Sequence, residues 1–168
     1  MTPDSVAYKH SLSFDQAFDP IRFFNGHMVA HGMFVDRFGL VRRRFDVKME
    51  CFAKNDQTQL NEFFTYDDGE TEQRIWTIYK KTDHDYTAKT DDVDGFALAT
   101  TNGPVFNLKY DFYLNMFGRR VKLRFNDMMV QQSDKVVLNR AEISKFGVRI
   151  GTVFITFFKS DAPAFKHA

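Results

Sequence analysis

From Gly26 onward, apolar and polar residues alternate in short segments, and β-branched and aromatic residues dominate. Turn-forming residues recur roughly every 8–12 positions, which is the spacing of an all-β meander. Helical periodicity is nearly absent, and only FDPIRFF at 18–24 predicts a short helix. The strands that the pattern predicts are 27–36, 40–53, 58–66, 70–80, 85–91, 95–101, 105–116, 120–126, 128–133, 136–145 and 148–159.

Consecutive antiparallel strands joined by short turns leave two unpaired edges unless the sheet closes on itself. We therefore predict an all-β fold, an antiparallel up-and-down meander that closes into a lipocalin-like, calycin-like barrel of about 8–11 strands with a short N-terminal helix. One domain is expected over 1–168, with a peripheral arm at 1–17, the helix at 18–24 and the barrel at 26–160. Such a barrel is either filled by side chains or holds one small ligand.

The segment TYDDGET contains the clearest turn signal. A three-residue loop over 67–69, with Gly69 in the left-handed conformation of a G1 bulge, places Glu62 opposite Arg74 on the neighbouring strand. A carboxylate and a guanidinium would then lie side by side among apolar groups and make each other's burial tolerable. A two-residue turn would instead shift the register by one and bring Glu62 opposite Ile75.

The charge balance gives no general attraction to polyanions. The chain has 23 Lys+Arg and 22 Asp+Glu, so neither nucleic acid nor an anionic membrane is favoured as a partner by overall charge, and any partner must be recognised locally.

The single cysteine, Cys51, cannot form an internal disulfide. The stretch before Phe23 lacks the apolar core of a secretion signal, and the apolar runs are too short to cross a bilayer. We expect a cytoplasmic protein without a membrane span.

No motif predicts a metal or a cofactor. His27 and His31 are four residues apart, which on a strand separates them by roughly 13 Å. The segment 90–95 resembles part of a calcium loop, but Thr90 and Thr101 occupy the first and twelfth ligand positions. There is no serine-hydrolase elbow, P-loop or dinucleotide-binding glycine motif.

Polar residues interrupt the predicted interior face at a few positions. Arg43 falls on the apolar side of the strand at 40–53, where a mouth arginine can also extend to solvent. The interior face near the C-terminus is predicted to carry Asn139, Ala141, Ile143 and Lys145, followed by Val148, Ile150, Thr152 and Phe154. This pattern is typical of a ligand cavity, and equally of a core whose polar groups are hydrogen bonded.

Eight of the twenty phenylalanines are predicted to lie in the interior, where they either fill the barrel or line a pocket. They are Phe23, Phe24, Phe45, Phe64, Phe106, Phe112, Phe125 and Phe154. Three tyrosines, Tyr66, Tyr86 and Tyr110, carry hydroxyls that need polar partners if they are buried.

The chain resembles a proteobacterial family known only as a domain of unknown function, many of whose members are predicted lipoproteins. The resemblance covers about residues 23–159 and rests on FFNGHMVAHGMFVDRFGLVRRRF, FFTYDDGETEQRIW, DDVDG and NRAEISKFGVRIGTVFITFFK. It implies a shared fold, and its pattern marks Asp67, Asp68, Gly69, Arg74, Trp76, Asp91, Asp92, Gly95, Asn139, Arg140, Lys145, Phe146 and Gly147. Asp127 is followed here by Met128 instead of tryptophan, and no lipidated cysteine is present, so envelope anchoring is not carried over.

The leading hypothesis is a barrel that binds a lipid or another apolar small molecule. Its predicted ligand-binding residues are Glu62, Arg74, Trp76, Tyr110, Asn139 and Lys145. The first alternative is an isomerase, cyclase or lipid-modifying enzyme in which Lys145 or Glu62 handles a proton. The second is a filled barrel that presents its surface to a partner.

Overall fold

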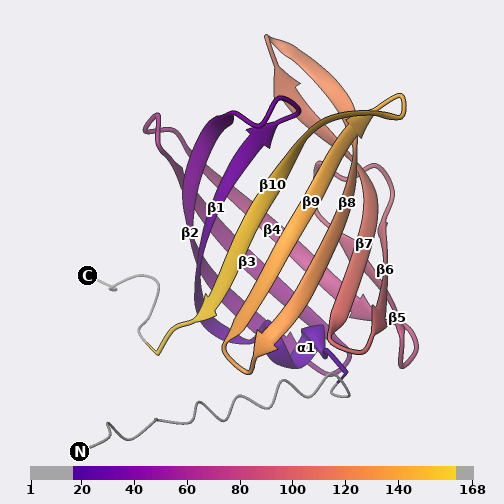
Figure 1. The fold of residues 1–168 in the computed structure, drawn as a ribbon. Coiled ribbons are helices and arrows are strands. Elements are labelled where there is room, and N and C mark those ends of the chain that lie inside the picture. The colour runs from indigo at the N-terminus through magenta and orange to yellow at the C-terminus, as the bar shows by residue number, and fades with distance from the viewer. Residues whose placement is uncertain (1–16, 162–168) are drawn as a thin grey trace, which may run out of the picture.

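The computed structural model describes residues 17–161, which form a closed antiparallel barrel of ten strands preceded by one short helix (Figure 1). The elements are α1 (Pro20–Phe23), β1 (Gly26–Asp36), β2 (Val41–Lys54), β3 (Gln57–Tyr66), β4 (Thr71–Lys80), β5 (Asp85–Lys89), β6 (Ala97–Asn102), β7 (Val105–Met116), β8 (Arg119–Ser133), β9 (Val136–Lys145) and β10 (Val148–Lys159). The arm predicted at 1–17 lies, apart from its last residue, outside the described residues.

Each strand pairs with the next one along the chain, and β1 pairs with β10 from Met28↔Lys159 to Asp36↔Gly151. This last ladder removes both sheet edges, so the predicted barrel is confirmed. The segments predicted as separate strands at 120–126 and 128–133 are one strand, β8. Asp127 resembles a turn residue in the sequence, but it stays in the ladder opposite both Leu108 and Ala141.

Helix α1 closes one end of the barrel, at the bottom in Figure 1. The Asp19 carboxylate accepts hydrogen bonds from the backbone N–H groups of Ile21 and Arg22, and Pro20 occupies the first turn, so both favour the start of a helix there. Phe24 follows the helix and is fully buried, with its ring edge against Phe157 at 5.5 Å between centroids. No helix within 17–161 is long and apolar enough to cross a membrane.

The β3–β4 hairpin has the three-residue loop that the sequence predicts. Tyr66 N–H donates to the Glu70 carbonyl oxygen, and Gly69 has φ 86°, which glycine adopts without steric cost. Glu62 therefore lies opposite Arg74, and the alternative register is excluded.

A bulge in β10 overturns part of the predicted interior face. The pairing of β10 with β9 shifts between Arg149 and Gly151, and one extra residue changes which side chains point inward. Beyond the bulge, Val153, Ile155 and Phe157 line the interior, whereas Phe154 is 40% exposed on the outer wall. The predicted interior positions of Val148, Thr152 and Phe154 are thus wrong, because none of these residues lines the interior cavity and Val148 is exposed.

Phe24→Ala should destabilise the fold by about 3–5 kcal/mol, because it leaves a cavity where the helix closes the barrel. Chemical denaturation of the variant measures the loss. Phe158→Ala on the outer wall is the matched control and should cost much less, since Phe158 is already 36% exposed. Equal losses in the two variants would contradict the role given to Phe24.

Candidate functional site

The barrel is hollow between α1 and the opposite end. A cavity of about 420 Å³ lies in its interior, which falls within the range of about 300–1,000 Å³ typical of small-molecule sites. Its walls are mostly aromatic and aliphatic, and they include Phe45, Leu60, Phe64, Trp76, Tyr110, Phe112, Phe125 and Met129. The hypothesis of a completely filled barrel is therefore wrong.

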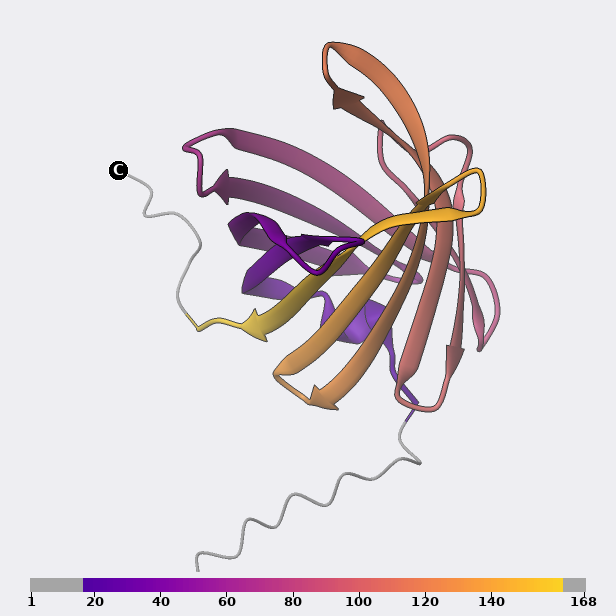
Figure 2. The same cartoon turned by 45° about the horizontal axis from the view of Figure 1, so that its top comes forward.

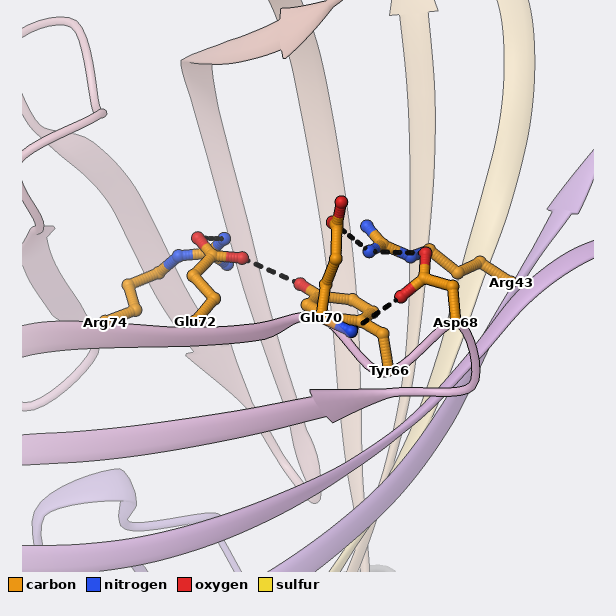
Figure 3. A network of polar contacts seen from close by, with 6 residues as sticks. All are labelled: Arg43, Tyr66, Asp68, Glu70, Glu72 and Arg74. Atoms are coloured by element: carbon orange, nitrogen blue, oxygen red, sulfur yellow. Dashed lines mark hydrogen bonds and ion pairs between the residues drawn. The ribbon is translucent and has the colours of Figure 1, made fainter.

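Arg74 enters this cavity from β4 with its charge already compensated (Figure 3). Its Nη2 lies 2.6 Å from Glu72 Oε1, and the Tyr66 hydroxyl donates to Glu72 Oε2 at 2.7 Å. The predicted partner, Glu62, faces Arg74 across the ladder but forms no ion pair with it. Glu72 takes that place because residues two apart on a strand share a face. Burial would lower the pKa of Arg74, but Glu62 and Glu72 raise it overall.

The loop carboxylates hold a second arginine at the mouth of the cavity. Arg43 Nη2 lies 2.9 Å from Asp68 Oδ2 and 2.6 Å from Glu70 Oε2, and its guanidinium covers the Tyr66 ring at 3.5 Å from the centroid (Figure 3). The Asp-Asp-Gly segment is thus a turn, and one of its carboxylates also fixes a residue that lines the cavity.

Two buried carboxyl groups in the cavity have no cationic partner. Glu62 on β3 and Asp127 on β8 both line the cavity, and within residues 17–161 neither forms an ion pair. The Tyr110 hydroxyl donates to Asp127 Oδ2 at 3.1 Å. Asp127 Oδ1 and Asn139 Oδ1 are buried without a hydrogen-bond partner among the described residues. Buried acceptors left unpaired cost free energy, so this level of the cavity is suited to a donor from a ligand.

Burial raises the pKa of Glu62 to about 7, with Glu72 and Asp127 adding to the rise and Arg74 opposing it. Burial also raises the pKa of Asp127 to about 7, and the nearby side chains of Tyr110 and Asn139, which favour the charged form, oppose this rise only in part. Both carboxyl groups therefore change charge near neutral pH. Burial raises the pKa of the Cys51 thiol to about 12, with the charge of Glu62 adding to the rise, so the thiol stays neutral.

Five of the six predicted ligand-binding residues line the cavity, namely Glu62, Arg74, Trp76, Tyr110 and Asn139. Lys145 does not. It ends β9 at the rim, where its Nζ donates to the Lys122 carbonyl oxygen at 3.2 Å and lies 4.6 Å from the centre of the Phe146 ring. A lysine at the end of a strand extends past the interior, so Lys145 lies outside the central cavity and lines a smaller hollow next to it.

Sequence reasoning missed Glu72 and Asp127 as site residues. The signal for both is parity, since Glu72 shares a face with Arg74, and Asp127 shares one with Phe125 and Met129. Of the residues that the family resemblance marks, Asp91, Asp92 and Gly95 lie in the β5–β6 connection, and none of them lines the cavity.

Comparison with known proteins shows both a family and a shared fold. The sequence profile described as "Protein of unknown function (DUF3833)" matches residues 4–159. The S-type phycobiliprotein lyase CPES from Guillardia theta superposes with a TM-score of 0.65 at 8% identity, covering 84% of this chain and 91% of that one. This likeness confirms the lipocalin-like barrel and, at such identity, nothing beyond the fold.

Designed barrels are more distant in structure. A de novo designed fluorescence-activating beta barrel has a TM-score of 0.46 at 12% identity, covering 85% of this chain and 99% of that one. The redesigned barrel mFAP1, bound to DFHBI, has a TM-score of 0.44 at 11% identity, covering 83% and 97%. No curated protein matches the sequence.

Stability should fall as pH rises from about 5 to 8. Glu62 and Asp127 have pKa values of about 7 in the folded state, above the ordinary values of 4.5 and 3.8. The folded protein then binds more protons than the unfolded chain, and this contribution is complete below about pH 4 and lost through pH 7. Denaturation midpoints across this range measure it. Combining Glu62→Gln with Asp127→Asn should flatten the slope.

Glu142→Gln is the control for this measurement, because it removes a half-exposed carboxylate that pairs with Arg140 on the outer wall. It should leave the slope as in the wild type. A double Glu62/Asp127 variant whose stability still falls between pH 5 and 8 would contradict the assignment.

Proposed function

This chain belongs to the DUF3833 family of proteins of unknown function, and we propose that its barrel binds a lipid or another small, mostly apolar molecule in the central cavity. The observation that carries the proposal is the 420 Å³ cavity, whose aromatic walls are interrupted by a few polar groups at one level. Sites for small molecules combine these two features, an apolar wall for affinity and sparse polar groups for orientation.

The walls supply the affinity. Trp76 meets Tyr110 edge to face at 5.3 Å between centroids, and Tyr110 stacks on Phe125 at 5.2 Å, so the rings form a preorganised surface. A ligand that covers these faces removes apolar area from water at little cost in side-chain entropy, because the rings are already held in place.

The polar groups orient the ligand. Asp127 Oδ1 and Asn139 Oδ1 are buried without a hydrogen-bond partner among the described residues, whereas Arg74 bonds Glu72 through Nη2 and keeps its Nε unpaired. We therefore expect the polar end of the ligand to carry a hydroxyl, which donates to these acceptors and whose oxygen can accept from Arg74 Nε, and to lie between β4, β8 and β9. Arg74 acts here through its charge, which moderates the repulsion among the carboxylates.

Native mass spectrometry of freshly purified protein should reveal a bound small molecule. Ala141→Phe places a ring in the cavity and should remove most of that adduct while the protein stays folded, because Ala141 lines the wall and is buried. Trp76, the only tryptophan, lines the cavity, so its fluorescence should report rebinding of the extracted molecule.

The adjacent Arg140→Phe is the matched control for this experiment, since Arg140 is exposed and Ala141 is not. It should retain the adduct. A wild-type protein without any adduct, whose Trp76 emission does not respond to lipid extracts, would refute the proposal.

The second candidate is an enzyme that moves a proton within the cavity. The observation that favours it is specific: Glu62 and Asp127 face the cavity, are free of ion pairs among the described residues, and have pKa values near 7. General acid–base catalysis needs groups of this kind. If this candidate is right, Glu62→Gln or Asp127→Asn keeps the bound molecule but abolishes its conversion, followed by mass or NMR spectrum over time. If the cavity only binds, the wild type returns its ligand unchanged.

A further inference from the structure

Strand connections surround the open end of the barrel, opposite α1 (Figure 2), and their sequences divide this rim into two chemically different halves. The β1–β2, β9–β10 and β7–β8 connections follow one another around the rim, because the strand order is β2-β1-β10-β9-β8-β7. Each of the three carries a phenylalanine, Phe38, Phe146 and Phe117 respectively, and we call these three residues the phenylalanine rim. They are the three most exposed large hydrophobic residues in the described part of the chain, at 73%, 92% and 99%.

Two of these phenylalanines occupy backbone positions that disfavour a bulky residue. Phe117 and Gly118 have φ of 51° and 73°, and Phe146 and Gly147 have φ of 50° and 76°. Two successive residues with positive φ are typical of type I′ hairpin turns, in which asparagine or aspartate precedes the glycine. A bulky residue is strained in this conformation, so phenylalanine is a poor choice for the turn. Burial of the ring does not offset this strain, since Phe117 and Phe146 are 99% and 92% exposed.

Basic side chains surround the phenylalanine rim. The connections at 36–42, 116–120 and 145–149 contain six basic residues and one acidic residue. The basic ones are Arg37, Arg42, Arg119, Arg120, Lys145 and Arg149, and the acidic one is Asp36, which pairs with Arg42. The connections on the other side of the rim, at 67–70 and 90–96, carry Asp67, Asp68, Glu70, Asp91, Asp92 and Asp94 and no basic residue. Five of these six carboxylates pair with basic side chains of the adjoining strands, namely Arg43, Arg44, Arg120 and Lys122. The near-neutral net charge of the chain conceals this separation.

We propose that the phenylalanine rim docks on the surface of a membrane that contains anionic lipid. Exposed aromatic rings insert at the boundary between headgroups and acyl chains, and the flanking arginine and lysine side chains meet lipid phosphates. Two of the basic groups already lie over these rings, Arg37 at 4.7 Å from the centre of Phe38 and Lys145 at 4.6 Å from the centre of Phe146. The three most exposed phenylalanines all lie on one half of the rim, which sets the tilt of the docked barrel.

The rim also connects with the cavity. Met116, Leu123 and Ile150 line both the central cavity and a smaller apolar hollow beside Phe117. The β7–β8 hairpin projects beyond the rest of the barrel in Figures 1 and 2 and carries Phe117 at its tip. A docked rim therefore places a continuous apolar path between the bilayer and the cavity. This docking goes beyond the proposed binding function and does not depend on which ligand the cavity holds.

The test uses cosedimentation of the full chain with vesicles of phosphatidylcholine and with vesicles of equal parts phosphatidylcholine and phosphatidylglycerol. We expect binding to the mixed vesicles that weakens with added salt.

Phe117→Asn and Phe146→Asn should each weaken binding roughly tenfold, since each removes a buried ring from the docked state. Both changes create the Asn-Gly sequence that this type of turn prefers, so both should raise the melting temperature. Loss of binding in a more stable protein cannot come from misfolding.

Phe52→Thr is the matched control, because Phe52 is 57% exposed on the outer wall near the closed end of the barrel. It should bind vesicles as the wild type does. Wild-type protein that leaves the mixed vesicles unbound would overturn the proposal, and so would asparagine variants that bind as well as the wild type. A dimer in light scattering that Phe117→Asn dissociates, with no vesicle binding, would instead assign the rim to a second copy of the chain. Vesicle binding and the mass-spectrometric adduct are separate readouts, so the two proposals can fail independently.

Discussion

The hydrogen-bonded ladder between β1 and β10 is the constraint on which the rest of the structure depends. Closing the sheet removes both edges and gives every strand an inner and an outer face. The alternation of side chains along each strand then decides which residues point into the barrel. At the bulge in β10 this alternation shifts, and a glycine occupies the crowded position. At Gly151, a Cβ atom would lie within 2.7 Å of the Phe34 ring and the Val35 carbonyl oxygen, so the bulged segment can pass only without a side chain.

Within the closed barrel, charge pairing determines which groups remain free for a ligand. Arg74 pairs with Glu72 on its own strand, and Glu72 also accepts the Tyr66 hydroxyl. Glu62 and Asp127 are left without cations, and burial keeps their pKa values near neutrality. The same arrangement that costs stability at high pH therefore leaves acceptors that face an apolar cavity. Native cores pair such groups, and the exceptions are commonly functional.

The two ends of the barrel differ in how their aromatic residues are packed. At the closed end, aromatic residues around α1 are buried and the carbonyl oxygen of Phe24 accepts a hydrogen bond from the Thr58 hydroxyl. At the open end, phenylalanines stand exposed in turns that would be more stable with asparagine. The proposed docking surface thus lies at the end of the barrel where the turn residues depart from local conformational preference.

The sequence by itself determined the meander, the closed barrel, the short helix and the hairpin register at Gly69, because these follow from local periodicity and turn chemistry. It also placed Glu62, Arg74, Trp76, Tyr110 and Asn139 on one interior face. Only the tertiary structure decided that Arg74 pairs with Glu72, that Asp127 faces the cavity, that Lys145 lies outside it, and that the bulge turns Phe154 outward. These outcomes depend on ladder shifts and on distances between side chains, and periodicity along a chain contains neither.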